Sequence, residues 1–94
     1  MAEDNSIFVG SKPFMNYVTA VVMQFTTKSA DTVIVKARGK FIAKAVDISE
    51  VAAKRFLDDS VDNSVVINSE EFKNDEGKDI RVSSIEITLT KKKK

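Results

Sequence analysis

The stretch VIVKARGKFIAKAV, residues 33–46, joins a strand signal to a helix signal at a single glycine. Before the glycine, small and β-branched residues alternate with Lys36 and Arg38, which predicts a strand with one apolar face. Gly39 interrupts this alternation, and from Lys40 onward apolar residues recur at helical spacing. The stretch therefore predicts a strand that passes directly into a helix.

The preceding segment also predicts a strand followed by a helix. Residues 6–10, SIFVG, predict a first strand, and a helix is expected from Pro13 to about Lys28, because proline suits the first helical position. The first helix is expected to bury Phe14, Tyr17, Val18, Val21, Val22 and Phe25. The second is expected to align Ile42, Ala45, Val46, Ser49, Ala53 and Phe56 on one face, and Phe41, Ile48, Val51 and Ala52 widen this apolar surface.

The C-terminal third predicts a long hairpin. Residues 58–64 are interpreted as a polar turn, and residues 64–74 and 78–90 as two strands joined by the turn NDEG. Ile85, Ile87 and Leu89 alternate with polar residues near the chain end, whereas both faces become polar close to the turn. This loss of an apolar face predicts an arm that extends beyond the core.

The element order predicts an α+β fold, β-α-β-α-β-β. It is expected to form a two-layer sandwich of a four-stranded mixed sheet, with two helices on one face and an extended β-hairpin arm. We expect one domain over residues 1–94, with flexible ends at 1–5 and 91–94.

Composition excludes several functions. The chain has 15 Lys+Arg against 14 Asp+Glu, and it has no cysteine and no histidine. Thiolate chemistry and the commonest general base are therefore absent, and no phosphate-loop or metal-binding motif occurs. The acidic pairs Asp58/Asp59 and Glu70/Glu71 are interpreted as solvated surface. We expect no enzyme activity, cofactor or metal, and, without a membrane-spanning apolar run, a cytoplasmic protein.

Cations gather where strands end and helices begin. Lys36, Arg38, Lys40 and Lys44 occur without an intervening acid, and Lys12 follows the first strand in the same way. Because helix N-termini bind phosphate, we interpret Lys12, Arg38, Lys40 and Lys44 as a basic patch for a nucleic-acid backbone. The alternative is that they are ordinary solubilising charges. The wide apolar surface of the second helix also indicates a homodimer.

The segments FVGSKPFMNYVTAVV, VIVKARGKFIAKAVDISEVAAKRFL and EGKDIRVSSIEITL together resemble the Alba family of small archaeal chromatin proteins. The resemblance covers residues 7–89. It implies homodimers that bind double-stranded DNA, and in many members RNA, with little sequence preference. In such proteins the dimer body lies over phosphates, the two arms reach along the duplex, and dimers can line up side by side.

The resemblance also assigns roles to residues of this chain. The implied nucleic-acid contacts are Lys12, Asn16, Tyr17, Arg38, Lys40, Lys44, Lys78 and Arg81. Phe56 matches an aromatic residue at dimer–dimer contacts. The family's loop often reads Gly-Lys-Lys-Pro, and here it reads GSKP, so Ser11 replaces one lysine and acetylation, if retained, falls on Lys12.

The expected function is architectural binding of double-stranded DNA by a chromosome-associated homodimer. RNA binding through the same surface stays open as an alternative, because both A-form and B-form backbones present phosphates. The arm's own negative charge would oppose its entry into a nucleic-acid groove, because its carboxylates outnumber its cations. The carboxylates are those of Glu70, Glu71, Asp75, Glu76 and Asp79, and the cations are Lys73, Lys78 and Arg81.

Overall fold

A computed structural model of the chain describes residues 5–92. Its elements follow the predicted order, with short 3-10 and π-helical segments flanking the second helix. They are β1 (Ser6–Phe8), α1 (Phe14–Thr26), β2 (Thr32–Arg38), η1 (Gly39–Phe41), α2 (Ile42–Val51), η2 (Ala52–Phe56), β3 (Val61–Lys73) and β4 (Asp79–Lys91).

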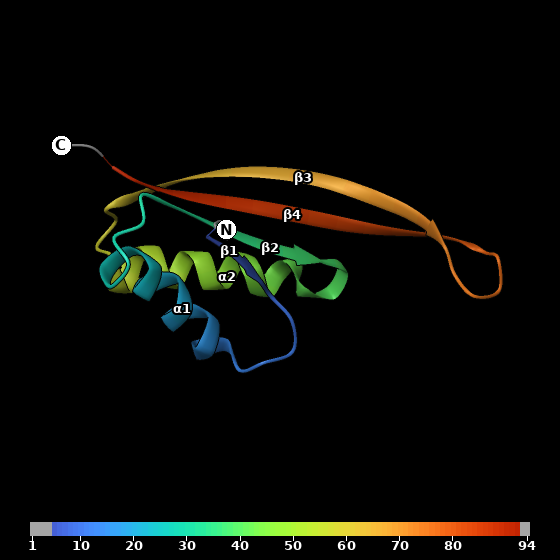
Figure 1. Cartoon of the computed structure of the whole chain (residues 1–94), viewed down its shortest axis with the longest axis horizontal. Helices are drawn as coiled ribbons and strands as arrows, with labels where there is room; N and C mark the ends of the chain where they lie inside the picture. The colour runs from blue at the N-terminus through green and yellow to red at the C-terminus, as the bar shows by residue number, and fades with distance from the viewer. Residues whose placement is uncertain (1–4, 93–94) are drawn as a thin grey trace.

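The four strands form one mixed sheet in the order β1-β2-β4-β3. β1 pairs with β2 in parallel, and the other two pairs are antiparallel. Both helices lie on one face of this sheet and leave the other face open (Figure 1). The predicted α+β fold is confirmed, and the parallel β1–β2 pair places the ends of the first two strands side by side.

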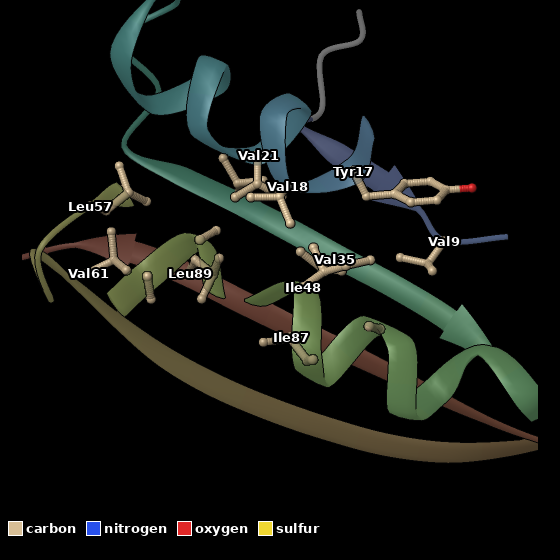
Figure 2. Packing of buried hydrophobic residues seen from close by; sticks show 14 of the residues in the cluster. Val9, Tyr17, Val18, Val21, Val35, Ile48, Leu57, Val61, Ile87 and Leu89 are labelled. Carbon is tan, nitrogen blue, oxygen red and sulfur yellow. The ribbon is translucent and has the colours of Figure 1, made fainter. Parts of the chain in front are cut away.

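The core lies between the sheet and the helices. Val33, Val35 and Ala37 point inward from β2 while Lys36 and Arg38 point outward, as their alternation predicts. The core is completed from β4 and the helices, with Val18, Val21, Ile48, Ile87 and Leu89 among its most buried residues (Figure 2). Burying each such side chain stabilises the fold by about 1.5–3 kcal/mol.

The buried face of the second helix agrees with the expected one at Ala45, Ser49 and Ala53, and it differs at Val46 and Phe56. Ile48 and Ala52 are fully buried, whereas Val46 and Phe56 are exposed. The expectation assumed a regular α-helical period from Lys40 to Phe56. Val46 lies within the regular helix α2, at the edge of the buried face, whereas Phe56 lies at the end of the π-helical turn η2, which changes the angle between successive side chains.

Two boundaries also differ from expectation. β3 begins at Val61 rather than at residue 64, because Val61 is buried and pairs with Lys91. At the ends of the described chain, Asn5 donates a side-chain hydrogen bond to the Thr32 carbonyl, and Lys92 donates its N–H to the Ser60 carbonyl. The remainder of the predicted flexible ends, 1–4 and 93–94, lies outside the described residues. α1 begins one residue after Pro13.

The hairpin arm extends well beyond the two-layer body. β3 and β4 stay paired from Val61–Lys91 to Lys73–Asp79, and the molecule measures 51 Å along its longest axis against 24 and 23 Å across (Figure 1). At the tip, the Asn74 side-chain oxygen accepts hydrogen bonds from the backbone N–H groups of Glu76 and Lys78. We define the arm as residues 69–83.

Candidate functional site

The candidate site begins where β1 and β2 end. The Val9 N–H donates to the Lys36 carbonyl at 2.9 Å, so the loop after β1 leaves the sheet beside the end of β2. Gly39 has a φ of +53°, a conformation that side chains disfavour, and it turns β2 directly into the next helical segment. The sequence therefore brings two strand-to-helix junctions to one end of the sheet.

The loop between β1 and α1 is held by one tyrosine and one lysine. The Tyr17 hydroxyl accepts hydrogen bonds from the N–H groups of Gly10 at 2.8 Å and Lys12 at 3.3 Å. The Lys44 ammonium donates to the carbonyls of the same two residues, at 2.7 and 2.6 Å. It also lies 5.1 Å from the centre of the Tyr17 ring. We call Tyr17 and Lys44 the loop clamp.

The clamp changes the interpretation of two predicted contact residues. Tyr17 is only 8% exposed, and the Lys44 ammonium is directed at loop carbonyls. Hydrogen bonds that involve a charged group contribute about 1.5–3 kcal/mol each, so Lys44 has a strong structural reason to stay in place. Both residues are therefore positioned to fix the shape of the loop that carries Lys12.

The other predicted body residues are exposed on the surface around this loop. Lys12, Asn16, Arg38 and Lys40 are all exposed, and Lys40 lies 5.4 Å from the ring of Phe41. Arg38 forms an ion pair of 3.0 Å with Glu70, which the sequence did not predict. Lys12 and Lys40 are linked through Lys44, which binds the Lys12 carbonyl and shares the Phe41 ring with Lys40, and one arm carboxylate reaches Arg38.

Two cations of the arm lie beside carboxylates of the arm itself. Arg81 lies 3.9 Å from Glu71, and Lys73 lies 2.9 Å from Asp79. Both pairs are exposed, so each contributes only about 0.2–1 kcal/mol, but each places an opposite charge beside the cation. Lys78 is exposed at the hairpin tip.

A hollow of about 460 Å³ adjoins the patch, and its position was not predicted. Its lining includes Phe8, Lys36, Arg38, Phe41, Glu70 and Glu86. The alternation of β1 contained a signal for it. Once Ile7 and Val9 face the helices, Phe8 between them must face the other way, and it is 71% exposed.

Apolar side chains are exposed at two further places. Phe56 is 51% exposed and borders a hollow of about 210 Å³ lined mainly by α1, including Met15, Val22 and Met23. On β3, Val65, Val66 and Ile67 are 51%, 55% and 76% exposed. Large apolar groups in contiguous patches are typical of contact surfaces.

Neither a metal-ligand cluster nor a membrane-spanning helix occurs in the part of the chain that the structure describes. Residues 5–92 contain no group of three or more acidic, histidine or cysteine side chains arranged to hold a metal ion. No helix within the same residues combines the length and hydrophobicity needed to cross a membrane.

The fold and the basic junctions define a class of small α+β domains with a two-layer body and a hairpin arm. The Alba family model matches residues 5–71. The chain belongs to the Alba family.

Individual relatives agree over nearly the whole chain. The "DNA/RNA-binding protein Alba" of Picrophilus torridus is 47% identical over 91 residues, covering 97% of this chain and 100% of the relative. The protein of the same name from Methanocella arvoryzae is 52% identical over 89 residues, covering 95% and 92%. The solved structure of Alba from Thermoplasma volcanium superposes with a TM-score of 0.83 at 46% identity, covering 93% of this chain and 100% of that one.

Proposed function

We propose that this protein is a homodimeric architectural protein that binds double-stranded DNA with little sequence preference and associates with the chromosome. The observation that carries the proposal is the clamped loop at the end of β1: Lys44 binds the Lys12 carbonyl, and Lys44 and Lys40 both lie near the Phe41 ring. The relatives named DNA/RNA-binding proteins support the same ligand class.

The mechanism follows from the type of contact. Exposed lysine and arginine side chains neutralise phosphates and release counterions, so affinity falls as salt rises. Phosphate contacts position a protein on a duplex but carry no base identity, which accounts for weak sequence preference. In this mechanism Lys12, Arg38 and Lys40 contact phosphates with Asn16 beside them, while Tyr17 and Lys44 hold the loop.

The arm makes a smaller electrostatic contribution in this mechanism. Lys78 and Arg81 would contact the duplex as the arm extends along it, but Arg81 is already beside Glu71. The arm then acts mainly through its reach and shape, and the body supplies most of the salt-dependent affinity.

A homodimer fits the apolar face of β3. Val65 and Ile67 pair with the buried residues Ile87 and Ile85, so they point toward the helix side of the sheet. The helices contact β2 and β4, and the main neighbour of β3 is β4, which leaves these side chains uncovered. A second copy would cover them. Phe56 and the hollow beside it would then serve contacts between dimers.

The phosphate mechanism is tested with two double variants of equal charge. Binding to a random-sequence duplex is measured at several salt concentrations for wild type and for Arg38→Ala/Lys40→Ala. The slope of log affinity against log salt should become shallower by about two for each protomer that contacts the duplex. The control Lys54→Ala/Arg55→Ala removes the same charges from η2, and it should change the slope little. Equal slopes for both variants would contradict a localised patch.

The dimer is tested with adjacent residues on opposite faces of β3. Ile67→Lys places a charge on the proposed interface and should give a monomer by analytical ultracentrifugation. Val66→Lys places the same charge on the open face and should leave the dimer intact. A folded Ile67→Lys protein that remains dimeric would overturn this interface.

RNA is the second candidate ligand, favoured by the names of the relatives. Competition between duplex DNA and structured RNA for the wild-type protein decides between the two.

Lys12 is also the proposed acetylation site. It is exposed, and acetylation would remove one charge from the patch, so the acetylated protein should bind the duplex more weakly.

A further inference from the structure

The open face of the sheet carries an ordered row of chemically different side chains. Phe8 on β1 pairs with Lys36 on β2, and Lys36 pairs with Glu86 on β4. Because residues opposite each other in a sheet point to the same side, an aromatic ring, a cation and a carboxylate stand next to one another. They line the hollow of about 460 Å³ that adjoins the basic patch.

Phe8 itself has no packing role that explains its character. It is 71% exposed, and its close charged neighbour is the Lys36 ammonium, 5.3 Å from the ring centre. An aromatic ring held on a rigid strand beside a cation offers a flat stacking surface next to a phosphate-binding group.

The carboxylates of the hollow select the kind of ligand. Glu70 and Glu86 repel a phosphate, but carboxylate oxygens accept hydrogen bonds from the amino groups at the edges of bases. A ligand that suits the whole hollow therefore combines an aromatic face, a hydrogen-bond-donating edge and a nearby negative charge. A nucleotide has all three.

We propose that this hollow binds an unpaired nucleobase of a single-stranded nucleic acid, stacked on Phe8, with its phosphate at Lys36 and Arg38 and its edge toward Glu86. A base inside a duplex is stacked and paired, so it cannot present its face to this ring. The site thus adds a single-strand mode to the proposed duplex binding, and it rests on that proposed function for the phosphate contacts that Arg38 shares.

The test compares variants at Phe8 on two ligands. Affinity is measured by fluorescence anisotropy for a short unstructured oligonucleotide and for a duplex of equal length, with wild type, Phe8→Leu and Phe8→Tyr. Loss of one stacked base should weaken single-strand binding of Phe8→Leu by about 5- to 30-fold. Phe8→Tyr keeps the aromatic face and should bind as wild type does, and duplex affinity should be unchanged for both.

Phe72→Leu supplies the matched control. Phe72 is 52% exposed and pairs with Ile80 on the arm, so the same substitution is made away from the hollow. Its single-strand affinity should stay at the wild-type value. Equal losses in Phe8→Leu and Phe72→Leu would overturn the base site, as would a Phe8→Leu loss that is as large on the duplex as on the single strand.

Two further comparisons complete the experiment. One shows whether the bound base comes from RNA or DNA, and the other shows whether a negative result concerns the base site alone or the proposed function as well. Single-stranded RNA and DNA of the same sequence are compared; a loss in Phe8→Leu with either one supports the site, and the tighter ligand identifies its source. Wild-type protein that binds the duplex but neither single strand overturns the base site alone. Wild-type protein that binds none of the ligands at low salt overturns the proposed function as well.

Discussion

The body and the arm both carry lysine and arginine side chains, but they differ in how many carboxylates accompany them. Residues 36–44 carry four cations and no carboxylate, whereas the arm carries five carboxylates and three cations. Lys73 and Arg81 on the arm pair with Asp79 and Glu71. On the body, Glu70 reaches Arg38 from the arm. The two regions therefore differ in how many carboxylates accompany their cations, and Arg38 and Glu70 form an ion pair where the regions meet.

The largest difference between the two regions is in stability, and β4 passes through both. Leu89 in the body is fully buried, and Leu89→Ala should lower the free energy of unfolding by about 2–5 kcal/mol. Ile80 in the arm is partly exposed, so Ile80→Ala should cost less than about 1 kcal/mol. Denaturant unfolding followed by circular dichroism measures both. Equal losses would mean that the arm belongs to the same cooperative core.

The next prediction separates a lysine that holds the loop from one that faces solvent. Lys44→Met removes two hydrogen bonds to the loop carbonyls of Gly10 and Lys12; one of them is exposed to solvent and contributes less, so the free energy of unfolding should fall by about 1–3 kcal/mol in total. Amide exchange in the loop should rise with it. Lys40→Met is the matched control, and it should change stability by less than about 0.5 kcal/mol.

The salt dependence of duplex binding also distinguishes Lys40→Met from Lys44→Met. Lys40→Met should reduce the salt slope by about one per protomer on the duplex, because each loses one phosphate contact. Lys44→Met should weaken binding with the slope retained, and Lys44→Arg should restore part of the affinity. If Lys44→Met lowers the slope as much as Lys40→Met does, Lys44 contacts phosphate and the clamp is not its main role.

The sequence predicted the strands in which apolar and polar residues alternate regularly. Val33, Val35 and Ala37 alternate as a half-buried strand must, and Ile85, Ile87 and Leu89 do the same. These patterns, together with the right-handed crossover expected of strand–helix–strand units, determine the layers and the strand ends. The resemblance to the Alba family then indicated which exposed residues to consider.

The details that were missed depend on contacts between distant residues. Lys44 reaches Gly10 across 34 positions, so its use as a clamp is invisible in local spacing. The Arg38–Glu70 pair depends on how far the hairpin register carries Glu70 along the sheet. The period of the second helix placed Phe56 on the buried face, because no residue type in that segment signals the π-helical turn η2; the resemblance, by contrast, assigned Phe56 to a surface contact.

The arm also differs from the body in how its turn is held. Gly77 has a φ of +78°, and a methyl group at this position would meet no atom within 4 Å, so Gly77→Ala adds backbone strain of about 1–2 kcal/mol without a clash. The strain should open the hairpin tip, seen as faster amide exchange near residues 73–79, while global unfolding changes less. Gly77→Asn tolerates this conformation better and should exchange more slowly than Gly77→Ala; the reverse order would exclude backbone strain as the cause.

The smallest expected effect tests the contact where arm and body meet. Glu70 competes with phosphate for Arg38, and an exposed ion pair of this kind contributes about 0.2–1 kcal/mol. Glu70→Gln keeps the size of the side chain and removes its charge, so it should tighten duplex binding by about two- to fivefold and steepen the salt slope.

Asp75→Asn is the control for this last change, because it removes one negative charge from the hairpin turn, away from Arg38. It should improve affinity less than Glu70→Gln does. If the two variants gain equally, the net charge of the arm matters and the Arg38–Glu70 pair does not. If Glu70→Gln gains more, the arm carboxylate limits the patch through direct competition, and the near-neutral composition of the chain reflects a binding surface whose affinity is held down by its own arm.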